Sequence, residues 1–413
     1  MCFKSQIVKL GPRSMSERKL KVGVSGLGRA FTLMLPTLMG DSRIQMVTAT
    51  DPHEAACRQF ERDFGVSCVK DFKTLCEHPG VEVIYIASPH QFHAEQVEWA
   101  ASHGKHVLVE KPMALNMDEC NRMIHAVQKA GTLMLVGHSH SFNGPILKAV
   151  ELINSGEYGE VRMIHALNYT DFLYRPRRPE ELDTQKGGGV IFSQAAHQLD
   201  IVRLLGGGLV QRVSAQTGAW DPVRATEGAY SAILSFTSGA FASVSYSGYA
   251  HFDSDQWMGG IGELGNVKDP QNYGAAKKRL SSLKAPEEEA HLKAARNYGA
   301  AQWDPSSAVD HSRAHQHFGP LIISCDRADL RPVPTGVWVD GDRASTLLEI
   351  PKPEVPRQEV IDELYEAIFN HQPILHSGQW ARATTELSLA ILESSRKQEM
   401  VNLQFQIKPY QNL

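Results

Sequence analysis

The stretch LKVGVSGLGRA, from Leu20 to Ala30, joins a short β-forming run to a turn that contains two glycines. An apolar segment of helix length follows at 30–39, and a second β-forming run covers 45–50. Strands that alternate with helices build βαβ units, because a parallel strand can be reached only through a crossover segment. The stretch therefore predicts the beginning of a parallel sheet.

The same alternation continues to about Gly144. Further strands are expected at 81–87, 106–109 and 133–137, and helices at 54–64, 94–102 and 118–130. Short apolar strands of this kind indicate a sheet that helices cover on both faces. We therefore expect an α/β domain of the Rossmann type, with a parallel sheet, over residues 15–144.

After Gly144 the pattern changes to longer alternating runs, which are typical of antiparallel strands with one covered face. The expected strands are 161–169, 210–217, 229–236 and 240–249, with helices at 145–154, 194–205, 358–371 and 378–395. They predict a second, α+β domain over residues 145–413 with an open, mostly antiparallel sheet. Residues 251–320 are polar and rich in Gly, Ala and Asn, so we interpret them as an insertion, in which Pro286 and three glutamates begin a helix.

The composition argues against several classes of protein. The 413 residues carry a formal net charge of -4, which disfavours nucleic acid or an acidic membrane surface as the main partner. No window approaches the ~18 consecutive apolar residues of a membrane span. The six cysteines form no C-x-x-C pair and are expected to be reduced thiols. We therefore expect a cytoplasmic protein that binds a small molecule.

The glycine turn is the first candidate binding site. Gly26 and Gly28 permit a tight turn and let backbone amides approach a diphosphate at a helix N-terminus. The usual dinucleotide pattern has a third glycine where this chain has Phe31, so the fingerprint is incomplete. Asp51 follows Gly28 by 23 residues and ends the second strand, where an acid accepts hydrogen bonds from the adenosine ribose. A carboxylate there repels the 2′-phosphate of NADP and favours NAD, and the alternative is that Asp51 only caps a helix.

Longer motifs carry a resemblance to a known family. They are VEVIYIASP (Val81–Pro89) with His93, GKHVLVEKP (Gly104–Pro112), a glycine run at 187–189 and HQLD (His197–Asp200). With them the chain resembles the Gfo/Idh/MocA oxidoreductases, which include glucose–fructose oxidoreductase and inositol dehydrogenase. The resemblance implies a Rossmann domain that binds NAD, chemistry without a metal, and assembly into a homodimer or homotetramer. The expected cofactor contacts are Gly26, Leu27, Gly28, Arg29, Ala30, Asp51, Ser88, Pro89, His93, Glu110 and Lys111.

The resemblance also implies catalytic roles for Lys111, which matches the active-site lysine of the family, and for His197, which matches its general base. Oxidising an alcohol removes a proton from oxygen as hydride leaves carbon. A neutral imidazole can accept that proton, and an ammonium can stabilise the developing alkoxide. Without the motifs, a surface lysine and a core histidine would be the simpler interpretations. Many members have an aspartate four residues before the histidine, where this chain has Ser193, so His197 must be tuned by another group such as Asp200 or a substrate carboxylate.

The stretch NYTDFLYRPRRPEE (Asn168–Glu181) is expected to border the substrate, because it lies between the first strand of the second domain and the glycine run. Its three arginines can pair bidentately with carboxylates, and its tyrosines can flank a flat ring. The alternative is a solvated loop that pairs internally with Glu180 and Glu181. The candidate substrate-binding residues are Tyr169, Asp171, Tyr174, Arg175, Arg177, Arg178, Ser193, His138 and His140.

Three stretches, at 139–142, 172–183 and 251–255, resemble one branch of the family, the dehydrogenases of phthalate 4,5-dihydrodiol. This branch implies oxidation of 4,5-dihydro-4,5-dihydroxyphthalate by NAD to 4,5-dihydroxyphthalate during aromatic degradation. The expected partner is then a small dihydrodiol that carries two carboxylates. The alternatives are a polyol or sugar dehydrogenase of the same family, a non-catalytic NAD-binding regulator, and a hydrolase or eliminase that uses NAD transiently.

Overall fold

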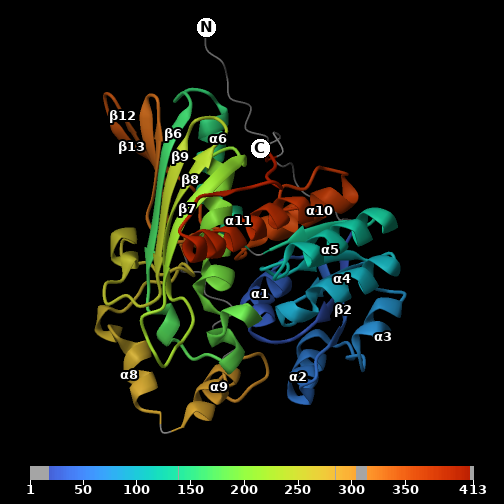
Figure 1. Cartoon of the computed structure of the whole chain (residues 1–413). Coiled ribbons are helices and arrows are strands. Elements are labelled where there is room, and N and C mark those ends of the chain that lie inside the picture. Colours follow the sequence, from blue (N-terminus) through green and yellow to red (C-terminus); the bar gives the residue numbers. More distant parts are fainter. Residues whose placement is uncertain (1–17, 138, 284, 304–313, 410–413) are drawn as a thin grey trace.

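A computed structural model describes residues 18–303 and 314–409, except residues 138 and 284. Two β-sheets lie side by side in it, with helices packed against and between them (Figure 1). The first sheet consists of parallel strands in the order β2-β1-β3-β4-β5, which confirms the expected parallel sheet. Its strands are β1 (Leu20–Ser25), β2 (Ile44–Thr50), β3 (Val83–Ile86), β4 (His106–Val109) and β5 (Met134–Val136).

Helices connect the strands of the first sheet. They are α1 (Arg29–Gly40), α2 (Glu54–Phe64), α3 (Phe72–Glu77), α4 (His93–Ser102) and α5 (Met117–Ala130). The ends of α5 follow from its sequence, because Asn116 accepts a hydrogen bond from the Glu119 amide and Gly131 adopts the left-handed conformation. The chain leaves β1 toward β2 on one side and returns to β3 on the other. This reversal of strand order places a ligand crevice at the carboxyl ends of β1 and β3.

The second sheet has the strand order β13-β12-β11-β10-β6-β9-β8-β7-β14. Its strands are β6 (Val161–Tyr169), β7 (Val210–Gly218), β8 (Ala229–Phe236), β9 (Phe241–Ser247), β10 (Leu321–Cys325), β11 (Ala328–Val333), β12 (Gly336–Gly341), β13 (Ser345–Glu349) and β14 (Val401–Asn402). Most neighbours are antiparallel, as expected. The one parallel pair in this sheet, among the described residues, is β6 with β9. A long crossover through a helix and two strands separates them, and such a connection permits parallel pairing.

The strands β10 to β13 are not foreseen by the sequence pattern. Each has only five or six residues, and turns of two or three residues join them. The strand β13, at the edge of the sheet, contains no fully buried residue. Alternation is nevertheless visible in β11, whose residues are in turn buried and less buried, and the sequence analysis missed this strand.

The helices α6 (Gly144–Asn154), α7 (Ala196–Leu205) and α11 (Gly378–Lys397) share an apolar core with the second sheet. The helix α10 (Gln358–Phe369) packs differently. Its residues Val360, Ile361 and Leu364 lie in the same buried cluster as Val24 and Phe31 of the first sheet and its helix. The chain thus returns to the first sheet after completing most of the second, and Figure 1 shows α11 between the second sheet and α5.

The segment 251–320 contains the helices α8 (Ala275–Ser281) and α9 (Pro286–Ala294) and then crosses to the first sheet. The ring of Tyr298 packs edge-on against Phe31, with the ring centroids 5.0 Å apart. The Tyr298 hydroxyl donates to Asp63 at 2.5 Å, and its backbone amide donates to the Thr32 hydroxyl at 3.0 Å. The inserted segment therefore joins the two parts of the chain.

The described part of the chain contains no helix that is long and apolar enough to cross a membrane. Its cysteines, at positions 57, 68, 76, 120 and 325, are free thiols. Burial raises the pKa of Cys76 and of Cys120 to about 12. Neither thiol is therefore a nucleophile near neutral pH.

We expect Tyr298→Ala to lower thermal stability, because it removes a ring that is 2% exposed from the junction between the inserted segment and the first sheet. Changes of this kind cost about 3–5 kcal/mol, so the midpoint of thermal unfolding should fall by several degrees. Tyr273→Ala is the matched control, because Tyr273 is 57% exposed in the same segment. Equal midpoints for the two variants would contradict the packing of Tyr298 on the first sheet.

Candidate active site

The glycine turn follows β1 at the reversal of strand order. Gly26 has a φ of +92°, and a side chain there would come within 2.8 Å of the Ser88 amide nitrogen. A side chain at Gly28 would meet nothing within 4 Å, and no side chain of the described chain caps α1 at this residue. The first amides of α1, at Arg29 and Ala30, can therefore bind a phosphate group. The turn fits the dinucleotide site that the sequence predicts.

Phe31 occupies the position of the missing third glycine. It is fully buried and packs on Phe60, with the ring centroids 6.1 Å apart, as well as on Tyr298. A third glycine normally lets the helix approach the strand closely. Here an aromatic cluster fills the space beside α1, and part of that cluster comes from the inserted segment.

The Asp51 carboxylate connects the end of β2 to the glycine turn. One oxygen accepts a hydrogen bond from the Leu27 amide at 2.7 Å, and the other accepts one from the His53 amide at 2.7 Å. Asp51 thus has a structural role, although its bonds reach the glycine turn and the residue before α2 and do not cap the first turn of that helix. A carboxylate oxygen can accept two hydrogen bonds, so the oxygen that faces Leu27 can also accept a ribose hydroxyl. The two roles are compatible.

The loops after β3 and β4 are joined by His93, which is buried. Its ring nitrogens lie 3.0 Å from the carbonyl oxygen of Ser88, which precedes Pro89, and 3.1 Å from that of Pro112. Burial lowers the pKa of His93 to about 4, so the neutral ring donates to only one of them at a time. Glu110, at the end of β4, accepts the Tyr85 hydroxyl at 2.6 Å. These predicted cofactor residues lie at the carboxyl edge of the sheet, and their contact with a cofactor stays a prediction.

Lys111 follows β4 and reaches the second part of the chain, where its Nζ donates to the Ser193 carbonyl oxygen at 2.8 Å. Residues 191–195 form one π-helical turn, a departure from α-helical hydrogen bonding that is frequent at functional sites. The Ser193 hydroxyl turns back to the Gly189 carbonyl oxygen, so this serine contributes its backbone to the site. Burial lowers the pKa of Lys111, whereas Glu110 and Glu263 raise it.

His197, near the start of α7, faces His140. The two rings meet edge to face, with their centroids 4.8 Å apart, and Phe318 lies 5.2 Å from both. Burial lowers the pKa of His140, which is 2% exposed, so this ring is neutral at physiological pH. The structure brings these two predicted histidines together. His138, the third, lies outside the described residues.

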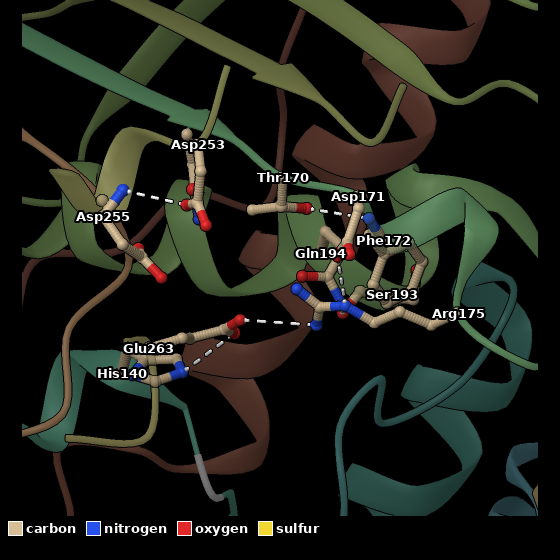
Figure 2. Close-up of polar contacts among 12 residues, drawn as sticks. His140, Thr170, Asp171, Phe172, Arg175, Ser193, Gln194, Asp253, Asp255 and Glu263 are labelled. Carbon is tan, nitrogen blue, oxygen red and sulfur yellow. Dashed lines mark hydrogen bonds and ion pairs between the residues drawn. The ribbon is translucent and has the colours of Figure 1, made fainter. Parts of the chain in front are cut away.

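Glu263 is the charged residue that the sequence analysis missed. One of its carboxylate oxygens lies 3.6 Å from His140 Nε2 and the other 3.9 Å from Arg175 Nη1 (Figure 2). Burial alone would raise the pKa of Glu263, but His140, Arg175 and His317 lower it to about 2, so the carboxylate is ionised. Among the described residues no group of three or more His, Cys, Asp or Glu side chains could hold a metal ion.

The three arginines of the loop after β6 face different partners. Arg175 pairs with Asp171 at 3.0 Å in addition to its contact with Glu263. Arg178 pairs with Glu180 at 3.2 Å and with Glu181 at 3.7 Å. The internal pairing that we considered for the whole loop therefore applies to Arg178.

Arg177 retains hydrogen-bonding capacity. Its guanidinium stacks 3.5 Å above the Phe172 ring, and one of its terminal nitrogens donates to the Phe172 carbonyl oxygen at 2.8 Å. Its Nε is buried and has no hydrogen-bond partner among the described residues. Burial lowers the pKa of Arg177 to about 10, which leaves it charged at neutral pH. The pKa of Lys111 is lowered chiefly by burial, and further by the positive charges of Arg357 and Arg177. Arg177 and Lys111 therefore act on the same site.

The two tyrosines that we predicted to flank a substrate ring, Tyr169 and Tyr174, lie against side chains of the segment 251–320. Tyr169 is 38% exposed, and its ring centroid lies 6.5 Å from that of Phe252. The ring of Tyr174 faces Lys277, whose Nζ lies 4.5 Å from the ring centroid. Both rings pack against the inserted segment, so a direct contact with a substrate stays a prediction for each.

Tyr246 of β9 is an aromatic residue of the site that the sequence pattern hides. Its hydroxyl lies 2.9 Å from the Thr170 hydroxyl and donates to Gln194 Oε1 at 3.2 Å. Its ring stacks on Phe318, with the ring centroids 6.1 Å apart. In the sequence it is one of several alternating apolar residues of a strand, and nothing there distinguishes it from a core residue.

Asp200, which we considered as a partner of His197, belongs to a buried network. Its carboxylate accepts hydrogen bonds from the Ser141 hydroxyl, from Trp380 Nε1 at 2.7 Å and from the Thr384 hydroxyl at 2.7 Å. These bonds connect α7 with α11 and with the loop after β5. Asp200 therefore stabilises the packing of the helices that carry the site.

Two family models match the chain. The model described as "Oxidoreductase family, NAD-binding Rossmann fold" covers residues 20–138. The GFO/IDH/MocA C-terminal domain covers residues 146–268. The two matches meet where the chain passes from the first sheet to α6.

Relatives and solved structures extend the likeness to nearly the whole chain. The 1-carboxy-3-chloro-3,4-dihydroxycyclohexa-1,5-diene dehydrogenase of Comamonas testosteroni is 48% identical over 385 residues, which are 93% of this chain and 96% of that protein. A myo-inositol 2-dehydrogenase of Thermotoga maritima is 28% identical over 254 residues, which are 60% of this chain and 74% of that protein. A crystal structure of a protein from Bordetella bronchiseptica RB50 has a TM-score of 0.88 at 40% identity and covers 93% of this chain and 100% of that one.

The family models cover the first sheet, the glycine turn and the strands β6 to β9, and the relatives extend the likeness to 93% of the chain. This likeness confirms the resemblance that the motifs at 81–89, 104–112 and 197–200 carry. The chain therefore belongs to the Gfo/Idh/MocA family of oxidoreductases and has the NAD-binding Rossmann fold of that family.

Proposed function

We propose that the protein is an NAD-dependent dehydrogenase that oxidises the cis-dihydrodiol of a carboxylated cyclohexadiene to a catechol. The observation that carries this proposal is the charged, half-buried Arg177, whose Nε is buried and has no hydrogen-bond partner among the described residues, in the site of Lys111 and His197. A carboxylate satisfies such a cation, whereas a neutral polyol brings no charge to it. The name of the Comamonas testosteroni relative, which describes a carboxylated dihydroxycyclohexadiene, supports the same class of substrate.

The residues of the site can perform this oxidation. NAD, when bound, supplies the acceptor for the hydride that leaves the carbinol carbon. His197 accepts the hydroxyl proton, and the Lys111 ammonium, held by the Ser193 carbonyl oxygen, stabilises the alkoxide as it forms. The resulting ketone tautomerises to the catechol. Because this aromatisation is strongly downhill, the site needs accurate positioning more than a strong base.

Within this class we infer that 4,5-dihydro-4,5-dihydroxyphthalate is the substrate. Arg175 and Arg177 lie over the same Phe172 ring, at 5.8 and 3.5 Å from its centroid, so two guanidinium groups are available to two adjacent carboxylates. The Asp171 partner of Arg175 is 38% exposed, and a substrate carboxylate can replace it at little cost. A dihydrodiol with one carboxylate is the second candidate, because the name of the relative describes only one.

Asp51 favours NAD over NADP in this proposal. Its carboxylate is held beside the glycine turn by the Leu27 amide and lies at the end of β2. An acid in this place accepts hydrogen bonds from the ribose hydroxyls and repels a 2′-phosphate.

Purified protein with NAD should form NADH rapidly when freshly prepared phthalate 4,5-dihydrodiol is added, and the absorbance of NADH measures the rate. Parallel reactions contain a dihydrodiol with one carboxylate, myo-inositol or glucose. Rapid turnover of the monocarboxylate alone would replace the phthalate assignment by the second candidate. Turnover of the polyols alone would contradict the proposed function.

Arg177→Ala should raise the KM for the dihydrodiol about 10- to 100-fold, because a charge-assisted hydrogen bond contributes about 1.5–3 kcal/mol. The KM for NAD should stay unchanged. Arg178→Ala is the matched control in steady-state kinetics, because its guanidinium faces Glu180 and Glu181. If both variants raise the KM equally, Arg177 is not the carboxylate ligand.

Asp51→Asn should lower the preference for NAD over NADP at least about tenfold, because the amide keeps the size of the side chain and removes its negative charge. The ratio of kcat/KM for the two cofactors measures this preference. Glu54→Gln is the control, since Glu54 is an exposed acid at the start of α2. An unchanged ratio in Asp51→Asn would exclude Asp51 as the residue that selects the cofactor.

A further inference from the structure

Glu263 stands on a short turn that the backbone holds in place. Ile261 and Val267 form a β-bridge at its base, and the Gly262 amide donates to the Asn266 carbonyl oxygen at 2.7 Å. The His317 amide donates to the carbonyl oxygen of Glu263 itself at 3.2 Å. The main-chain position of Glu263 is therefore fixed by contacts within the segment 251–320.

The Glu263 carboxylate faces two site residues at once. One oxygen is directed to His140 and the other to Arg175, at 3.6 and 3.9 Å, and Figure 2 shows the carboxylate between them. Its side chain is 20% exposed. Two partners, one from the loop after β5 and one from the loop after β6, thus meet on a carboxylate of the segment 251–320.

The hydrogen bonds of Asn143 define the tautomer of His140. Asn143 Nδ2 donates to the Gln316 carbonyl oxygen at 2.9 Å, and a carbonyl oxygen can only accept, so this atom is the amide nitrogen. The same nitrogen lies 2.9 Å from His140 Nδ1, which must then be the acceptor. The proton of the neutral ring is therefore on Nε2, the atom that faces Glu263. The carboxylate and the amide together hold His140 in one orientation, with its ring against that of His197.

The charge of Glu263 also acts on Lys111. Burial lowers the pKa of Lys111, and the acids that oppose this effect are Glu110 and Glu263, while Arg357 and Arg177 add to it. Glu110 is itself buried, and burial raises its pKa. Glu263 is ionised because His140, Arg175 and His317 face it. It therefore supplies a fixed negative charge to a site in which position 193 is an uncharged serine.

We propose that Glu263 is a positioning residue for the dehydrogenation, which orients the neutral His140 against His197 and balances the charges of Lys111 and Arg175. The segment 251–320 then completes the active site in addition to joining the two parts of the chain. This inference rests on the proposed oxidation of an alcohol at Lys111 and His197. It does not depend on which dihydrodiol is the substrate.

Glu263→Gln tests this role, because it keeps the size of the side chain and removes its charge. We expect kcat to fall about tenfold at neutral pH. We also expect the alkaline limb of the pH profile to move to lower pH. The sign follows from the charge: without Glu263 the ammonium form of Lys111 is less favoured, so it loses its proton at a lower pH. The KM for NAD should not change, and Glu263→Asp should recover part of the rate.

Glu287→Gln is the matched control, since Glu287 is an exposed acid in the first turn of α9 in the same inserted segment. It should leave kcat and the pH profile unchanged. Two results would overturn the proposal for Glu263: a kcat within about twofold of the wild type at every pH, or an equal loss at every pH without movement of the alkaline limb. All variants are assayed with the substrate that the wild type oxidises. If the proposed function is wrong, the wild type itself does not oxidise a dihydrodiol. If only this inference is wrong, the wild type is active and Glu263→Gln behaves like it or loses activity equally at every pH.

Discussion

The hydrogen bond from Lys111 to the Ser193 carbonyl oxygen joins the end of a strand of the first sheet to a helix on the second. Two local features make it possible: Lys111 directly follows β4, and residues 191–195 wind as a π turn ahead of α7. A buried ammonium is costly unless charges of opposite sign lie near it. Glu110 supplies one such charge from β4, and Glu263 supplies another from the inserted segment. The site is thus arranged around the Lys111 ammonium group, whose neighbours come from the first sheet, from the π turn and from the segment 251–320.

Segments that are distant in the sequence hold the two sheets in the relative position that the hydrogen bond from Lys111 to Ser193 requires. The helix α10 returns to the apolar core of the first sheet, and the buried Arg43 pairs with Asp41 and with Asp362 of that helix, both at 2.6 Å. On another side, Tyr298 anchors the inserted segment to α1 and α2. Asp362 and Tyr298, which make these contacts with Arg43 and with α1 and α2, are more than two hundred positions away from them in the sequence, and the family motifs describe none of these contacts.

Local patterns in the sequence predict the parts of the molecule that depend on local physics. The glycine turn, the alternation of strands and helices and the motifs around Lys111 and His197 each lie within a few consecutive residues, and their structures follow from that order. What could not be predicted arises from packing at a distance. The parallel pairing of β6 with β9 depends on where a long crossover returns. Glu263 and Tyr246 enter the site only because their segments pack on it, and no spacing relates them to the motifs.

The pairing of charges around Arg177 has a consequence for how an anionic ligand arrives. Arg175 and Arg178 have acidic partners, Lys293 pairs with Glu181, and Lys111 has two acids near it. Charges more than about 8–10 Å apart are screened at physiological ionic strength, so an approaching anion meets a site that is almost neutral from afar. Long-range steering therefore contributes little to its encounter with the protein, and the rate of association depends only weakly on salt. In the proposed reaction, discrimination begins on contact, when a carboxylate oxygen of the substrate reaches the Arg177 guanidinium above Phe172.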